Sequence, residues 1–122
     1  MCSKPTVLVI SAHAADFVWR CGGAIASHAE QGYNVTVACL SFGERGESAR
    51  LWKEGKSLQE VKDIRRKEAE TAAEALGVHE LECFDLGDYP LHLEKEDKFR
   101  LVDLIRKVRP KFMLSHSQHE PY

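Results

Sequence analysis

Thr6-Val7-Leu8-Val9-Ile10, followed at once by Ser11-Ala12-His13-Ala14-Ala15-Asp16, is the stretch that decides the fold of this chain. Its first five residues form an unbroken, mostly β-branched run, which is typical of a strand buried on both faces of a parallel sheet. A second run of the same kind covers residues 33–40. Because a strand buried on both faces needs a layer on each side, the two runs predict an α/β fold.

Helical patterns alternate with these strands. The predicted helices cover residues 17–31, 57–76 and 95–108, and the further predicted strands cover residues 81–86 and 111–115. Ser57-Leu58-Gln59-Glu60 is a capping box, which marks the start of the second helix, and Gly77 is placed to end it. The glycine-bearing stretch 41–56 has no sustained period and is predicted to be a loop. The alternation predicts one domain over residues 1–122, a Rossmann-like three-layer α/β/α arrangement with a mostly parallel sheet.

The composition excludes several classes of protein. The 122 residues include 17 Lys and Arg against 19 Asp and Glu, and the net charge of −2 excludes the broad basic surface of a nucleic-acid binder. No apolar run approaches the roughly 20 residues that cross a bilayer, so we expect no membrane association. The four cysteines form no CxxC pair, which favours reduced thiols in a cytoplasmic protein.

His13 and Asp16 follow the first strand directly, at the carboxyl edge of the predicted sheet, where open α/β folds bind their ligands. An imidazole and a carboxylate that converge there are suitable ligands for a first-row metal, with zinc the first candidate. In the alternative interpretation, Asp16 caps the following helix and His13 only packs. The spacing alone does not separate the two interpretations.

The segment after the second strand carries Glu44, Arg45 and Glu47 between glycines, which let the backbone turn closely around a ligand. Either carboxylate could act as a general base, and Arg45 could bind a substrate carboxylate through two hydrogen bonds. The alternative is a solvent-exposed turn with a local ion pair.

Further polar residues are expected at the same edge. His116 and His119 follow the last predicted strand, and each could be a ligand, a proton donor or a substrate contact. Asp85, at the end of the third predicted strand, and Asp88, in the loop after it, are weaker candidates. The charged stretch 62–70 alternates in sign, so we expect it to be a solvated helix face.

The motif Ala12-His13-Ala14-Ala15-Asp16 resembles the AHPDDE signature of the PIG-L/LmbE-like zinc enzymes, which are mostly N-deacetylases acting on glucosamine derivatives. The resemblance extends over the whole chain, and it implies that His13 and Asp16 bind zinc. The general base of the deacetylases corresponds to position 15, which is Ala15 here, and their usual proline corresponds to Ala14. The carboxylate that activates water for amide hydrolysis is therefore missing.

Residues 11–17, together with 41–48 and 84–91, are more similar to a divergent hydratase branch of this family. That resemblance implies a hydro-lyase that adds water to a carbon–carbon double bond of a tricarboxylate, in the breakdown of gallate and protocatechuate. Zinc would polarise the substrate, Glu47 or Glu44 would take the proton of the water, and His116 would act as acid or orienting group. Arg45 and Arg20 would bind the carboxylates of this small-molecule substrate.

The family's third zinc ligand is a histidine in a downstream motif, expected beyond Tyr122, and His119 is a poor substitute because its spacing differs. We therefore expect the chain to be the N-terminal part of a longer protein. A zinc-dependent sugar N-deacetylase and an inactive fragment are the alternative functions. The sheet edge left open after the last strand favours association, so we expect a homo-oligomer.

Overall fold

The structure, a computed structural model, describes residues 4–118 of the chain. Its strands are β1 (Thr6–Ser11), β2 (Asn34–Cys39), β3 (Glu80–Cys83) and β4 (Phe112–Leu114). Its helices are α1 (Asp16–Glu30), α2 (Ala49–Lys53), α3 (Leu58–Leu76) and α4 (Lys95–Val108). The alternation of strands and helices agrees with the order that the hydrophobic patterns predict.

The four strands form one parallel sheet in the order β3-β2-β1-β4. β1 is central and pairs with β2 along its whole length, from Thr6 opposite Asn34 to Ser11 opposite Cys39. On its other side β1 pairs with β4, with Val7 opposite Phe112. The chain places β2 and β3 to one side of β1 and β4 to the other, so the strand order reverses between β1 and β4. In open α/β sheets this reversal lies beside the usual ligand crevice.

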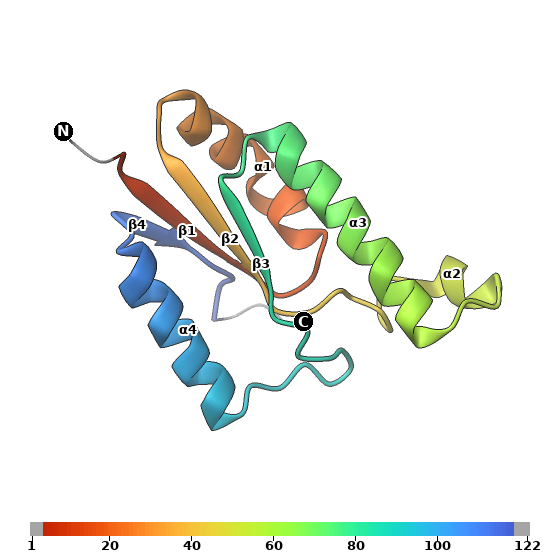
Figure 1. Cartoon of the computed structure of the whole chain (residues 1–122). Coiled ribbons are helices and arrows are strands. Elements are labelled where there is room, and N and C mark those ends of the chain that lie inside the picture. The colour runs from red at the N-terminus through yellow and green to blue at the C-terminus, as the bar shows by residue number, and fades with distance from the viewer. Residues whose placement is uncertain (1–3, 119–122) are drawn as a thin grey trace.

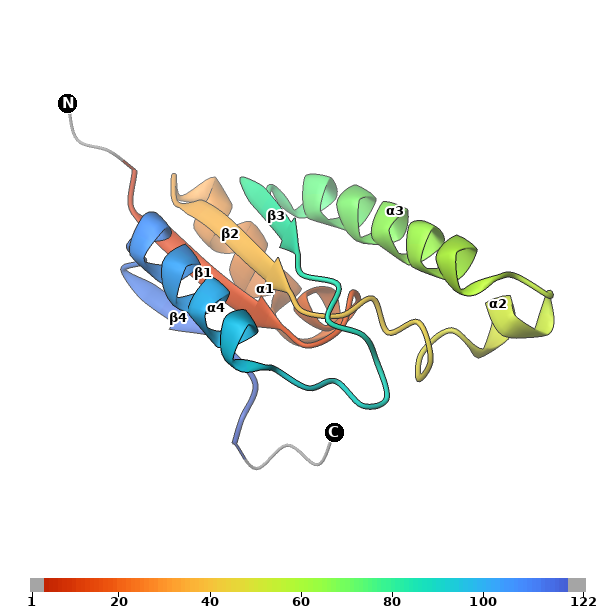
Figure 2. The same ribbon diagram turned by 60° about the horizontal axis from the view of Figure 1, so that its bottom comes forward.

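Helices cover both faces of the sheet, as Figures 1 and 2 show: α1 and α3 lie on one face and α4 on the other. Side chains alternate along β1, so Val7 and Val9 join the core beneath α1 and α3, whereas Leu8 joins the core beneath α4. All three are almost completely buried. The predicted three-layer α/β/α architecture is therefore confirmed.

Two element predictions are wrong in detail. Residues 41–56, predicted to be a loop, contain the short helix α2, in which Leu51 is buried and the Trp52 Nε1–H donates to the carbonyl of Glu44 at 2.6 Å. These tertiary contacts stabilise a helix too short to show a hydrophobic period. The third strand, predicted over 81–86, ends at Cys83, because Asp85 adopts a left-handed conformation with φ of 55°.

Two further observations concern the cysteines and the apolar character of the helices. Cys21, Cys39 and Cys83 are free thiols, and Cys39 is buried in the core. None of the helices in residues 4–118 combines the length and the apolar character needed to cross a bilayer.

The capping box of α3 is confirmed and provides a test of the fold. The Ser57 Oγ accepts the Glu60 N–H at 3.2 Å, and the Glu60 carboxylate accepts the Ser57 N–H at 3.0 Å. We expect Ser57→Ala to lower the free energy of unfolding by about 1 kcal/mol, since an N-terminal amide of the helix loses its partner. Urea denaturation measures the change.

Ser27→Ala is the matched control, because Ser27 is exposed within α1 and its hydroxyl accepts an exposed side-chain N–H of Gln31 at 3.1 Å, not a backbone amide of a helix N-terminus. Alanine is the better helix former there, so stability should stay the same or rise slightly. An equal loss in the two variants would contradict a specific role for the cap.

Candidate metal centre and active site

The loop after β1 is held in one conformation by the side chain of Ser11. Its hydroxyl donates to the His13 carbonyl at 2.6 Å and accepts the Phe17 N–H at 3.1 Å. The Asp16 Oδ2 accepts the backbone N–H of His13 at 3.0 Å. The N-cap residue of α1 is Ala15, so the interpretation of Asp16 as a helix cap is wrong. Its carboxylate turns back towards His13 instead.

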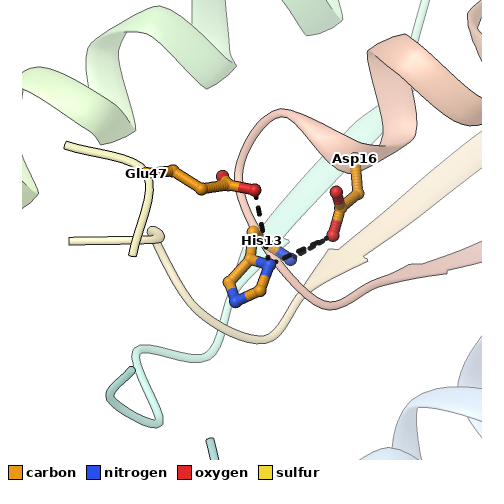
Figure 3. Close-up of side chains that lie close together, drawn as sticks. All are labelled: His13, Asp16 and Glu47. Atoms are coloured by element: carbon orange, nitrogen blue, oxygen red, sulfur yellow. Dashed lines mark hydrogen bonds and ion pairs between the residues drawn. The ribbon is translucent and has the colours of Figure 1, made fainter. Parts of the chain in front are cut away.

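Acidic side chains surround His13 at the carboxyl edge of the sheet. The His13 Nδ1 lies 3.3 Å from the Asp16 Oδ2 and 3.7 Å from the Glu47 Oε1, and Figure 3 shows the imidazole between these two carboxylates. One ligand atom from each of the three residues lies within 4.8 Å of the others. An imidazole with two carboxylates is a donor set that suits a divalent first-row metal, so the three residues fit a metal ion.

The electrostatics of this group are those of a cation site. The hydrogen bond to Asp16 raises the pKa of His13 to about 9, against the opposing effect of burial, and the charge of Glu47 adds to the rise. Burial opposes ionisation of Asp16, yet the hydrogen bonds from His13 outweigh it and hold the pKa of Asp16 below its usual value. Without a metal the positive charge resides on the imidazole, and a metal ion would replace that proton.

Glu47 reaches this group from the loop after β2. Its N–H donates to the Gly43 carbonyl at 3.1 Å, and Gly43 has a positive φ of 67°. The Glu47 Oε2 lies 3.7 Å from a terminal nitrogen of Arg65, whose Nε donates to the carbonyl of Phe42 at 3.3 Å. The expectation that residues 62–70 form only a solvated face is therefore wrong for Arg65, because its side chain is 15% exposed and turned towards Glu47.

Asp88, a weaker candidate in the sequence, is a neighbour of His13. Its Oδ1 lies 3.2 Å from the His13 Nε2, and its Oδ2 accepts the N–H groups of Arg45 at 2.9 Å and Gly46 at 2.8 Å. Burial opposes ionisation of Asp88, but these backbone donors and His13 lower its pKa overall. Asp85 lies apart from them and forms an ion pair with Lys62 at 3.0 Å.

The two glutamates of the β2 loop occupy different environments. Glu44 is buried and accepts a hydrogen bond from the Ser41 hydroxyl at 3.3 Å. It is not part of the group formed by His13, Asp16 and Glu47. Arg45 is exposed, and its backbone rather than its side chain contacts Asp88.

A cavity of about 290 Å³ lies beside the candidate metal ligands, between the ends of β1 and β4. Its wall includes Asp16, Arg20 and His116. The Arg20 Nε lies 3.9 Å from the Asp16 Oδ1, and the His116 Nε2 accepts the Ala12 N–H at 3.0 Å and lies 3.6 Å from the Asp16 Oδ2. His119 lies outside the described residues.

A parallel sheet that gathers an imidazole and several carboxylates at its carboxyl edge defines the class: an α/β domain with a candidate metal centre at the reversal of strand order. The chain belongs to the PIG-L family, described as GlcNAc-PI de-N-acetylase, which it matches over residues 8–121. The resemblance carried by the motif around His13 is thereby confirmed.

Individual relatives are similar over nearly the whole chain. It is 60% identical over 98% of its length to 4-oxalmesaconate hydratase of Pseudomonas putida, and covers 46% of that protein. The crystal structure of 4-carboxy-2-hydroxymuconate hydratase from Pseudomonas putida superimposes with a TM-score of 0.93 at 60% identity, over 97% of this chain and 49% of that one. N,N′-diacetylchitobiose deacetylase from Pyrococcus horikoshii gives a TM-score of 0.85 at 31% identity, over 96% and 42%. The chain thus spans about half the length of the curated relatives it matches.

Gly43 tests the placement of Glu47. A Cβ at Gly43 would lie 2.7 Å from the Glu47 Oε2, so Gly43→Ala should displace the carboxylate and weaken Zn²⁺ binding by about tenfold or more. The positive φ adds a stability loss of about 1–2 kcal/mol. A competing chromophoric chelator measures the Zn²⁺ affinity, and urea denaturation the stability.

Gly55→Ala separates the displacement of Glu47 from the loss of stability that a positive φ causes. Gly55 has a φ of 79°, yet a Cβ there meets nothing within 4 Å. This variant should lose similar stability and keep the Zn²⁺ affinity of the parent chain. Equal affinities in the two variants would contradict the placement of Glu47 beside the metal.

Proposed function

We propose that this chain carries the zinc site of a hydratase, a hydro-lyase that adds water to the carbon–carbon double bond of 4-oxalomesaconate in the breakdown of gallate and protocatechuate. The observation that supports this most is the 60% identity to 4-oxalmesaconate hydratase along 98% of the chain. The geometry agrees with it, because the position of the deacetylase base holds Ala15 while Glu47 lies 3.7 Å from His13.

His13 and Asp16 would hold the zinc, together with a histidine expected further along the protein. The His13 Nδ1 faces the Asp16 carboxylate at 3.3 Å and is the nitrogen available for a metal on that side. When bound, zinc would supply a Lewis acid that draws electron density from a substrate oxygen. The two side chains are partly exposed, His13 at 21% and Asp16 at 14%.

Glu47 is the proposed general base. Its carboxylate is 37% exposed, so water can reach it, and a terminal nitrogen of Arg65 lies 3.7 Å from its Oε2. Glu47 would take one proton from water as the hydroxyl oxygen bonds to one carbon of the double bond. The neighbouring carbon gains one proton, so the proton held by Glu47 balances the addition. Glu44, buried against Ser41, is the weaker candidate for this role.

His116 is proposed as an orienting residue. Its Nε2 accepts the Ala12 N–H, so this nitrogen holds no proton to donate while that hydrogen bond lasts. The contact ties the loop after β4 to the loop that carries His13. The Nε2 also lies 3.6 Å from the Asp16 Oδ2, so His116 is a polar neighbour of that carboxylate besides His13 and Arg20.

Arg20 is the proposed anchor for a substrate carboxylate. It lines the cavity of about 290 Å³ beside Asp16, and a guanidinium can bind a carboxylate through two hydrogen bonds. Arg45, exposed on the loop before Glu47, would meet a second carboxylate at the rim. A small polycarboxylate is therefore the substrate class that these charges favour.

A zinc-dependent N-deacetylase of sugar conjugates is the second candidate, because a deacetylase at 31% identity shares the fold. Ala15 argues against it, since the resemblance assigns the deacetylase base to that position. An inactive fragment is the third candidate. We also propose a cytoplasmic location, which the free thiols Cys21, Cys39 and Cys83 favour, and self-association through the sheet edge at β3.

Substitution of the two glutamates tests the mechanism. Glu47→Gln should slow hydration 10²- to 10⁴-fold per bound zinc ion, because glutamine cannot accept the proton of water, so zinc content is measured alongside the rate. Glu44→Gln should stay within about tenfold of the parent protein. Loss of the ultraviolet absorbance of the conjugated tricarboxylate measures hydration. If neither substitution slows it by more than about tenfold, the base is misassigned, and acetate release from N-acetylglucosamine conjugates instead of hydration would favour the deacetylase.

Removal of the Arg20 charge tests the substrate anchor. Arg20→Gln should raise KM at least about tenfold, as the loss of a hydrogen bond between charged groups predicts, and change kcat less. Arg50→Gln is the matched control, because Arg50 is exposed and pairs only with Glu54 among the described contacts of its side chain. The same KM in Arg20→Gln and in the control would rule out Arg20 as the anchor.

A further inference from the structure

Asp88 joins three loops that are distant in the sequence. It lies on the segment after β3, contacts His13 from the loop after β1, and accepts two backbone N–H groups from the loop after β2. His13 and Asp88 are 75 positions apart. The Asp88 side chain is 3% exposed, so this carboxylate is placed among protein groups and not in solvent.

We propose that Asp88 is a positioning residue that fixes the orientation of His13 and holds the Glu47 loop against it. This role rests on the proposed function, which assigns His13 as a zinc ligand. An ionised carboxylate only accepts hydrogen bonds, so the His13 Nε2, 3.2 Å away, must carry the proton of their contact. In the neutral ring that a metal ion binds, the lone pair then lies on Nδ1, on the side of Asp16 and Glu47.

A histidine that binds a metal usually donates its other ring N–H to a carboxylate or carbonyl, which fixes the tautomer and the direction of the ring. Here the two ring nitrogens face different acids: Asp88 at Nε2, and Asp16 with Glu47 at Nδ1. Asp88 occupies the Nε2 and therefore leaves Nδ1 as the nitrogen that binds the metal.

The second oxygen of Asp88 acts on the Glu47 loop. The N–H groups of Arg45 and Gly46 converge on the Oδ2 at 2.9 and 2.8 Å, and Glu47 is the next residue. Hydrogen bonds to a charged acceptor are short and strong, so the backbone entering Glu47 is fixed relative to His13. One carboxylate thus sets the spacing between a proposed ligand and the proposed base.

Asp88→Asn tests the role with little change in shape. The amide oxygen can keep both backbone N–H groups, and its NH₂ group then faces the His13 Nε2 as a donor. The neutral imidazole should then carry its proton on Nδ1, where it blocks the metal. We expect Zn²⁺ to bind 10- to 100-fold more weakly than in the parent chain, measured with a competing chromophoric chelator.

Asp85→Asn is the matched control. It makes the same change three residues earlier in the same segment, at a carboxylate that pairs with Lys62, and asparagine tolerates the left-handed conformation at this position. Its Zn²⁺ affinity and urea midpoint should match those of the parent chain. Equal Zn²⁺ affinity in Asp88→Asn and Asp85→Asn would overturn the proposal.

The proton on the His13 Nε2 can also be observed in the parent chain, so this test does not depend on whether a variant folds. With ¹⁵N-labelled histidine, a proton–nitrogen correlation spectrum should detect a slowly exchanging proton on the His13 Nε2, with or without Zn²⁺, and Asp88→Asn should lose it. A protonated Nδ1 with a bare Nε2 in the parent chain would overturn the proposal. If the parent chain holds this proton yet binds no Zn²⁺, the proposed zinc site fails while the orientation by Asp88 stands.

Discussion

The parallel pairing of β1 with β2, unbroken from Thr6 to Ser11, is the constraint on which the rest of the structure depends. Parallel strands end at the same edge of a sheet, so the loops after β1, β2 and β3 must meet there. Burial of β1 on both faces fixes its register, because a shift of one residue would exchange the two cores that Val7 and Leu8 occupy. The convergence of His13, Glu47 and Asp88 follows from this pairing.

The candidate site concentrates negative charge around one imidazole. Asp16, Glu47 and Asp88 all lie within 4 Å of a ring nitrogen of His13, and the hydrogen bond to Asp16 contributes most to raising the pKa of that imidazole to about 9. Three carboxylates near one cationic ring leave an excess of negative charge, which favours the binding of a divalent ion. The three carboxylates differ in exposure, from 3% for Asp88 and 14% for Asp16 to 37% for Glu47. Glu47 is the one that water reaches most easily, which favours it for the role of base.

Local patterns predicted the architecture, and contacts between distant segments explain what they missed. β-Branched runs, the Ser57 capping box and Gly77 are local signals, and the strands and α3 agree with them. The helix α2 depends on the burial of Leu51, which no short-range period reveals. Arg65 reaches Glu47 from another element, so its role could not be predicted from the alternating charges around it. The sequence placed Asp88 at the correct edge of the sheet, but its contact with the Nε2 of His13 is visible only in the structure.

The central claim is that the edge of this sheet presents the Nδ1 of His13 and the carboxylate of Asp16 to a zinc ion, with Glu47 beside it. Anomalous diffraction at the zinc edge from crystals grown with Zn²⁺ tests it most directly. The account predicts one strong peak about 2.0–2.2 Å from both ligand atoms, with the Nε2 of His13 still bonded to Asp88. A zinc ion on the Nε2 of His13, or one bound without Asp16, would contradict it.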